Sequence, residues 1–268
     1  MPDLTPEAVR EIRRLLEEAR REIAATVASS DWAVRRQSML LAEIDHQLAQ
    51  FDEQARRALK RPLDAQFGEG QAVVDGALAG RGVSVALFPQ IAASNLAAAA
   101  QSDLAGKITH LTRDAKAEIA RALNVGLLGG KTPFETMTEI GKSLDGGRFK
   151  LVAARAELIV KEEFGRVYRK GAQLRQEQAA ARVAGLKKRW LHAGHPRVPR
   201  PTHLALHGVV IGVTERFDLV NMKTGEVEHP LHPKDRVLSA ENSIACGCVA
   251  QPWKESWNLT LPELPAVA

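Results

Sequence analysis

Histidines and cysteines gather in a C-terminal stretch that contains Arg200-Pro-Thr-His-Leu-Ala-Leu-His-Gly208 and closes on Ala245-Cys-Gly-Cys248. His203 and His207 are four residues apart, which places them on one face of a helix. Cys246 and Cys248 are two residues apart, so in an extended strand their side chains share a face. Two imidazoles and two thiolates can then converge on tetrahedral zinc. We therefore predict these four residues as candidate metal ligands, in a small module that a metal would stabilise.

Two other roles for this stretch stay open. Structural zinc ligands usually come as Cys-x₂₋₄-Cys, and a one-residue spacer strains a shared site, so a metal-free hydrogen-bonded motif centred on His203 is the main alternative. Both cysteines would then be small buried hydrophobes. The other alternative is catalysis by His203, Glu163 and Cys246. No activated-nucleophile, phosphate-loop or paired-carboxylate signature supports it. We therefore expect no enzymatic activity and no required cofactor, with zinc as the ligand to test.

The composition of the chain changes near residue 185. Residues 186–268 hold eight of the thirteen prolines, six of the eight histidines, both cysteines and three of the four tryptophans. Alternating apolar residues at 209–214 and 224–228 predict short strands, and residues 218–225 suit a hairpin loop. We expect a small α+β domain with short strands, containing the Cys and His residues, over 185–258 and a tail over 259–268.

Residues 1–184 predict a mostly α-helical region. Thr5 can cap a first helix whose apolar residues recur at spacings of three and four. A second helix, from about residue 31 to residue 59, would form an antiparallel hairpin with it. Residues 61–103 are interrupted by Pro62 and five glycines, so we expect short helices and some mobility there. The remaining predicted helices are a long one at 102–128, a short one from the capping box Thr132–Glu135, and a basic one at 149–183.

The basic helix carries most of a local charge excess. Residues 148–200 hold fourteen Lys and Arg against four Asp and Glu, in a chain of net charge +5. Arg155, Arg166 and Arg169 share one helical face, which predicts a contact surface for a partner protein or for the phosphates of double-stranded DNA. A solvated helix face is the alternative, because no aromatic residues are interleaved to stack on bases.

The bulk sequence bounds the compartment. No apolar stretch reaches the roughly 18 residues that a membrane span needs, and the N-terminus has no signal-peptide core. Two cysteines one residue apart provide no disulfide framework, which suits a reducing compartment. We therefore expect a chain made in the cytoplasm, with no membrane partner.

An ordered series of motifs in the C-terminal stretch resembles one known family. The series is Trp190, Pro196 to His203, Leu206-His-Gly208, Phe217, Pro233-Lys-Asp235 and Glu241-Asn-Ser-Ile-Ala-Cys-Gly-Cys248. It is similar to the C-terminal domain of the phage Mu F-like head-morphogenesis proteins, whose pattern ends in Asn-Cys-Arg-Cys. Here Asn242 is displaced and Gly247 stands between the cysteines. The likeness extends over about residues 104–252.

The resemblance implies a structural function in phage head assembly. Family members are minor capsid proteins that associate with the portal, so it implies portal protein and other capsid components as partners. It also implies contact with packaged DNA, assembly in the host cytoplasm, and a final location in the capsid interior or at the portal vertex. The residues it marks as the structural motif are Trp190, Arg200, Gly208, Phe217, Asp235 and Asn242. Two alternatives stay open: a nucleic-acid-binding protein, and a zinc- or cysteine-dependent effector enzyme delivered with the genome.

Overall fold

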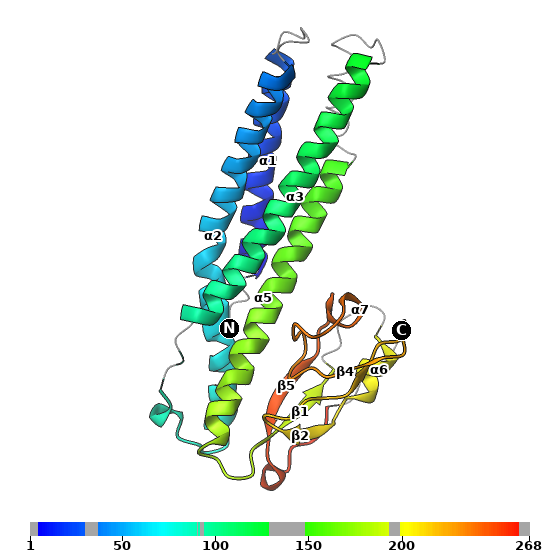
Figure 1. Ribbon diagram of the computed structural model, residues 1–268. Coiled ribbons are helices and arrows are strands. Elements are labelled where there is room, and N and C mark those ends of the chain that lie inside the picture. The colour runs from blue at the N-terminus through cyan, green and yellow to red at the C-terminus, as the bar shows by residue number, and fades with distance from the viewer. Residues whose placement is uncertain are drawn as a thin grey trace. The chain divides into compact units, whose positions relative to one another are not determined.

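The computed structural model describes residues 5–29, 37–89, 91, 94–128, 148–192 and 199–262. Four long helices make up most of the described chain (Figure 1): α1 (Thr5–Ser29), α2 (Gln37–Ala79), α3 (Ser94–Leu128) and α5 (Arg148–Ala180). Short helices and short antiparallel strands follow, together with the His and Cys residues. The predicted fold class, a mostly helical N-terminal region with a small α+β part after it, is confirmed.

The other elements are all short. They are η2 (Val85–Leu87), β1 (Lys187–Leu191), α6 (Pro201–Ala205), β2 (Val210–Gly212), β3 (Leu219–Val220), β4 (Val227–Glu228), α7 (Ala240–Ser243), β5 (Val249–Trp253) and η3 (Glu255–Trp257). The alternating pattern predicts β2 and β4. It does not predict β1 and β5, because Lys187-Lys-Arg189 and Pro252 are unusual in strands.

The chain divides into two compact units. One consists mainly of residues 63–97 and 162–268, and the other mainly of residues 2–62 and 98–161. The division passes through α2, α3 and α5. The short strands therefore share a unit with parts of α2 and α5, whereas the change in composition suggests a boundary near residue 185.

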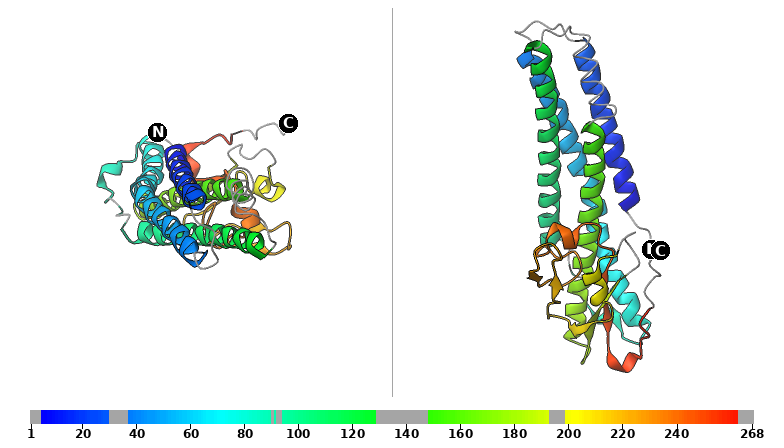
Figure 2. Two further views of the ribbon diagram at one scale, coloured as in Figure 1. Left: turned by 90° about the horizontal axis from the view of Figure 1, so that it is seen from above. Right: turned by 90° about the vertical axis from the view of Figure 1, so that its right-hand side faces the viewer.

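The unit of residues 2–62 and 98–161 is helical in its described part. α1 buries the apolar residues that the spacing predicts, namely Val9, Ile12, Leu16, Ala19 and Ile23. Gln47 of α2 donates a hydrogen bond from Nε2 to Thr26 Oγ1 of α1 at 2.7 Å, which ties the two predicted hairpin helices together. Thr109 of α3 donates to Asp52 of α2, also at 2.7 Å. Figures 1 and 2 show these segments running alongside one another.

The prediction of short, interrupted helices over residues 61–103 is wrong. α2 continues through Pro62 and three glycines to Ala79, and α3 begins at Ser94. The local propensity of these residues disfavours a long helix, but tertiary packing overrides a propensity of this size.

Glycines let two helix segments approach closely within the other unit. A Cβ atom on Gly70 of α2 would lie 2.0 Å from the carbonyl oxygen of Tyr168 on α5. A Cβ atom on Gly171 of α5 would lie 2.3 Å from the carbonyl oxygen of Phe67 on α2. Both positions therefore need glycine, because any side chain there would overlap the backbone of the facing helix.

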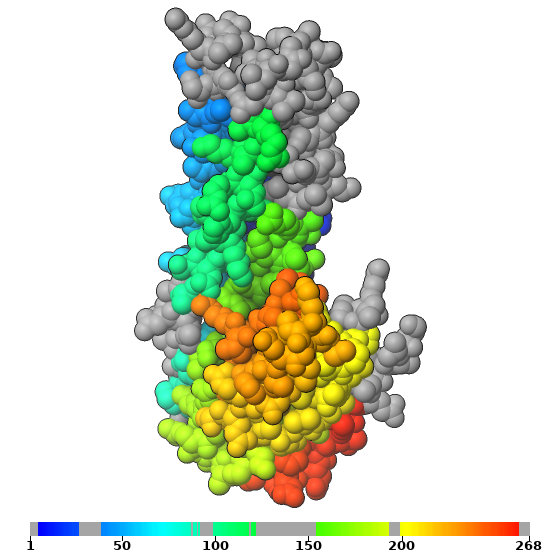
Figure 3. Space-filling model, turned by 45° about the vertical axis from the view of Figure 1, so that its right-hand side comes forward, coloured from blue at the N-terminus to red at the C-terminus, as the bar shows by residue number. Residues whose placement is uncertain are grey.

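The strands of the same unit form a small sheet and a hairpin. β1 is the central strand of a three-stranded antiparallel sheet in the order β2-β1-β5. β3 and β4 form a separate hairpin, whose loop overlaps the one predicted at 218–225. Trp190, Leu206, Phe217, Leu219, Leu238, Cys246 and Cys248 form one buried cluster. Residues 185–262 are called the C-terminal module below, and Figure 3 shows one face of its described residues, coloured from yellow to red.

Two sequence predictions lie outside the described residues. They are the short helix from Thr132–Glu135 and the part of the tail after residue 262. Among the helices that are described, none has a segment long and apolar enough to cross a membrane.

Candidate metal centre

Three of the four predicted ligands converge in the core of the C-terminal module. His203 Nδ1 lies 3.6 Å from Cys246 Sγ and 3.5 Å from Cys248 Sγ. The three donor atoms lie within 4.8 Å of one another, and the residues are 2%, 3% and 1% exposed. Zinc–sulfur and zinc–nitrogen bonds of roughly 2.3 and 2.0 Å, at a tetrahedral angle, hold sulfur and nitrogen roughly 3.5 Å apart. The spacing of these donor atoms therefore fits ligands that share one zinc ion.

The prediction of His207 as a ligand is wrong. α6 ends at Ala205, so the four-residue spacing no longer places His207 on the helix face of His203. Nδ1 of His207 accepts a hydrogen bond from the backbone N–H of His192 at 3.0 Å. Its Nε2 donates to the carbonyl oxygen of Pro262 at 2.8 Å. Both ring nitrogens are therefore engaged away from the cysteines.

Asn242 and Glu228 orient the His203 ring. His203 Nε2 lies 3.3 Å from Asn242 Oδ1, a hydrogen-bond acceptor, so Nε2 carries the proton and the Nδ1 lone pair faces the sulfurs. Asn242 Nδ2 donates in turn to Glu228 Oε2 at 3.1 Å. Burial alone would raise the pKa of Glu228, but hydrogen bonds from Ser239, Asn242 and Asn221 lower it. Histidines that bind metals commonly have this kind of outer support.

Trp190 closes the apolar side of the centre. Its ring meets Phe217 and His203 edge-on, with centroids 5.0 Å and 6.1 Å away. The indole Nε1 is buried and has no hydrogen-bond partner among the described residues. The hydrogen bond with Cys246 and burial raise the pKa of Cys248, and the indole N–H of Trp190 lowers it only in part.

The pKa values of the two thiols are shifted in opposite directions. The hydrogen bond with Cys248 lowers the pKa of Cys246 against the effect of burial, and His203 and Arg169 add to the lowering. The same hydrogen bond, together with burial, raises the pKa of Cys248. Only one of the two sulfurs therefore ionises readily by itself. A bound divalent cation would deprotonate both, since a coordinating thiol loses its proton outright.

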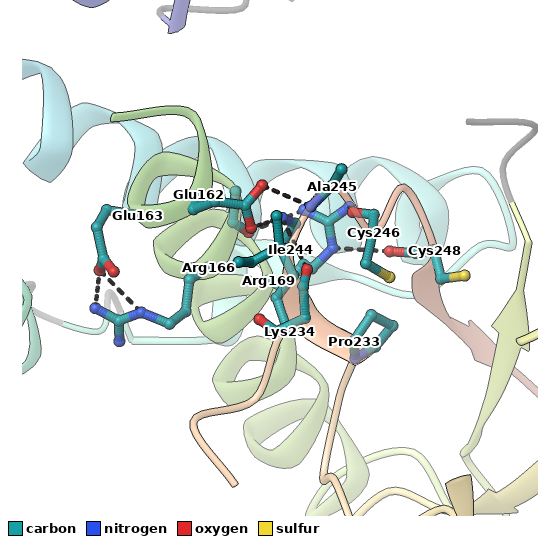
Figure 4. A network of polar contacts seen from close by, with 12 residues as sticks. Glu162, Glu163, Arg166, Arg169, Pro233, Lys234, Ile244, Ala245, Cys246 and Cys248 are labelled. Carbon is teal, nitrogen blue, oxygen red and sulfur yellow. Dashed lines mark hydrogen bonds and ion pairs between the residues drawn. The ribbon is translucent and has the colours of Figure 1, made fainter. Parts of the chain in front are cut away.

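Side chains of α5 hold the backbone of the Cys-x-Cys segment (Figure 4). Arg169 donates from Nε to the carbonyl oxygen of Cys248 at 2.7 Å and from a terminal nitrogen to that of Cys246 at 3.3 Å. Glu162 accepts a hydrogen bond from the Ala245 N–H at 2.8 Å and forms an ion pair with Lys234. Ala245 has a φ of 55°, a left-handed turn just before the first cysteine. These contacts direct both sulfurs toward His203.

All three arginines of the predicted contact face have partners within the protein. Arg169 is occupied by the two cysteine carbonyls, and Arg166 binds Glu163 one turn earlier, with only 15% of its side chain exposed. The assignment of these two partly exposed arginines to a partner or DNA surface stays a prediction, because no contact with a partner is described. Arg155 remains at the surface, paired with Asp114 at 3.2 Å. Helical spacing showed that the three share a face but not that acceptors already occupy it.

The other residues of the resembling motif also lie around this core. Trp190 and Phe217 are buried, and Asn242 supports His203, as described above. Arg200 donates to the carbonyl oxygen of Ile244 at 2.7 Å. Gly208, at a φ of 89°, donates its N–H to the carbonyl oxygen of Trp190 at 2.8 Å. Asp235 accepts the N–H of Leu231 at 2.8 Å.

Sequence periodicity did not predict the contacts of three supporting residues. Glu162 and Lys234 form a pair 72 residues apart, and Lys188 is fully buried, with its Nζ donating to the Leu231 carbonyl oxygen at 2.7 Å. Lys188 also lies 5.3 Å above the Phe217 ring, and burial lowers its pKa to about 8. Contacts over such separations leave no signal in helix or strand periodicity.

A cavity of about 200 Å³ lies elsewhere in the same unit. Its walls come from α2, α5, β5 and the turn at His232 and Pro233. Gln176 lines it with a buried Oε1 that has no partner among the described residues. None of the three converging ligands lines this cavity. The candidate metal centre is therefore not part of its wall.

Comparisons with known proteins assign no family. No protein-family profile and no solved structure matches this chain. The uncharacterized protein YqbB of Bacillus subtilis (strain 168) is 37% identical over 81 residues. That match covers 30% of this chain, and the chain spans 25% of the length of that relative.

Proposed function

We propose that this chain is a structural protein of phage head assembly whose C-terminal module is a metal-stabilised docking domain. The observation that carries the proposal is the packing of the resembling motif. Its residues are spread over positions 190–248, yet Trp190, Phe217, Cys246 and Cys248 share one buried cluster, which His203 and Asn242 adjoin. A motif whose members support one another in a core is typical of a structural domain.

The burial of the centre favours a structural role over catalysis. A substrate must reach the reacting groups, but His203, Cys246 and Cys248 are almost completely buried. Their polar neighbours are also engaged, because Asn242 bonds to Glu228 and Arg169 bonds to the cysteine carbonyls. Contact with DNA is left out of the proposal, since Arg166 and Arg169 are occupied within the protein.

Zinc is the metal that we propose for the centre. Two thiolates and one imidazole form a donor set that suits zinc and disfavours magnesium or calcium. Elemental analysis of the purified full chain is expected to find one zinc per chain. The double variant C246S/C248S should lose it, whereas M222A, at an exposed methionine, should keep it. Wild-type protein that is folded and metal-free, and that takes up no zinc on titration, would refute this assignment.

The docking role is tested with a phage portal protein from the same source as the chain, which the proposal expects to be its partner. Co-expression followed by size-exclusion chromatography is expected to yield a complex of the two proteins. A W190A variant should lose the complex, because truncating a fully buried tryptophan collapses the core of the module. If M222A lost the complex to the same degree as W190A, the intact core of the module would not be what the complex requires. A wild-type chain that binds neither portal nor other capsid proteins contradicts the proposal.

A further inference from the structure

The three converging donor atoms would leave the fourth position of a tetrahedral zinc ion without an assigned ligand. Structural zinc sites have four protein ligands, whereas catalytic sites have three and a water molecule. His203, Cys246 and Cys248 supply three. The identity of the fourth ligand therefore decides whether the centre holds the module together or presents a reactive metal.

The register of the sheet places His192 opposite Cys248. β1 and β5 are antiparallel, and the last recorded pairs are Trp190 with Ala250 and Leu191 with Val249. Continuing this register by one residue pairs His192 with Cys248. Residues directly opposite in an antiparallel pair have Cβ atoms roughly 4.5–5.5 Å apart and point to the same face. His192 therefore lies next to Cys248, one of the three converging ligands, and its side chain is on the same face of the sheet.

The alternation along β1 leads to the same result independently. Trp190 and His192 are two residues apart, so their side chains leave the strand on one face. Trp190 on that face is in edge contact with the His203 ring. His192 is 6% exposed, so its side chain is enclosed by the module. Its backbone N–H is held by His207 Nδ1 at 3.0 Å, which anchors the main chain where the strand ends.

Two other described histidines of the module have hydrogen-bonded rings. His207 uses both ring nitrogens, as shown above. His232 is buried, and its Nδ1 bonds to the Pro233 carbonyl oxygen at 2.9 Å. The ring of His192 is not within the 4.8 Å span of the three donor atoms, so coordination requires a rotation of its side chain. Because His192 directly follows β1, its side chain can rotate without any change in the register of the strand.

We infer that His192 is the fourth ligand and that the centre is a closed Cys₂His₂ site formed by His192, His203, Cys246 and Cys248. The inference rests on the proposed zinc site and makes it a structural one. It assigns the second histidine to the end of a strand, in place of the His207 that helical spacing suggests.

X-ray absorption spectroscopy of the zinc-loaded full chain tests the inference without any variant. The expected zinc shell is two sulfurs and two imidazole nitrogens. A shell of two sulfurs, one imidazole and one water oxygen overturns the inference while leaving the zinc proposal intact. A wild-type chain that binds no zinc overturns both, so the two failures are distinguishable.

Variants give a second, independent measurement. H192A should weaken zinc binding by more than the roughly 10- to 100-fold that loss of a supporting residue costs. H192C should restore a four-ligand site, and after cobalt substitution it should show a stronger thiolate charge-transfer band than wild type. H229A, at an exposed histidine of the same module, is the matched control and should bind zinc with four protein ligands. Unchanged zinc affinity in H192A, or loss of a nitrogen ligand in H207A but not in H192A, would overturn the assignment.

Discussion

Asn242 connects the candidate centre to the hydrogen bonds around it. Its Oδ1 faces His203 Nε2, and its Nδ2 donates to Glu228. We expect N242A to weaken zinc binding roughly 10- to 100-fold, since an unsupported histidine loses its fixed tautomer and ring orientation. Competition with a chromophoric chelator measures the change. M222A serves as the exposed control, and equal affinities in the two variants would show that Asn242 does not act through the ring.

The burial of His232 leads us to expect a free energy of unfolding that depends on pH, independently of any bound metal. Burial lowers its pKa to about 4 in the folded chain, against about 6.5 when unfolded. Between these values the unfolded chain binds the extra proton, so the contribution is complete above pH 6.5 and falls as the pH drops toward 4. The loss is on the order of 3 kcal/mol.

Urea unfolding at pH 7 and pH 4.5 checks this prediction for His232. H232Q should have a shallower pH dependence than wild type over that interval. H229Q changes an exposed histidine and should follow the wild-type curve. A wild-type free energy of unfolding that is flat from pH 7 to pH 4.5 would contradict the prediction.

At the scale of elements, two glycines of α2 differ sharply in the space that an added side chain would find. G70A would force a methyl group against the Tyr168 carbonyl, and we expect it to destabilise the chain by about 1–3 kcal/mol. G68A, on the same helix, meets nothing within 4 Å and should stabilise by about 0.5–1 kcal/mol, because alanine is the better helix former. Chemical denaturation compares the two, and effects of the same sign would refute the close helix contact.

Helix boundaries show what local patterns can predict. The apolar spacing of α1 and the helix at 148–180 are readable from sequence, since periodicity acts within one element. The continuous α2 is not, because Pro62 and three glycines lower its local helix propensity, and tertiary packing such as the contact of Gly70 with α5 overrides that propensity. Likewise, α6 ends after five residues, so a spacing that suits a helix misplaces His207.

At the scale of the whole molecule, metal removal should affect the parts of the chain unequally. Three of the four tryptophans lie in the C-terminal module, and Trp190 contacts the His203 ring. Treatment with a strong zinc chelator is expected to shift the tryptophan fluorescence and to lower the melting temperature that this fluorescence reports. Most of the helical circular dichroism should remain. Restoring zinc should reverse both changes. A chelated protein whose fluorescence transition is unchanged would show that the metal does not hold the module together.

The sequence by itself determined the class of fold and the neighbourhood of the centre. Helical spacing defined the long helices, and the change in composition marked the His and Cys module. The two-residue spacing of Cys246 and Cys248 indicated a shared face. All of these are short-range properties, set by the periods of helix and strand.

Only the tertiary structure decided which side chains meet. His203 faces Cys246 and Cys248 across more than forty residues, and Arg169 binds the carbonyls of both. The register of β1 and β5, continued by one residue, puts His192 rather than His207 opposite Cys248. Register and helix ends depend on contacts between distant segments. Periodicity within one segment therefore identifies the candidate groups but does not pair them.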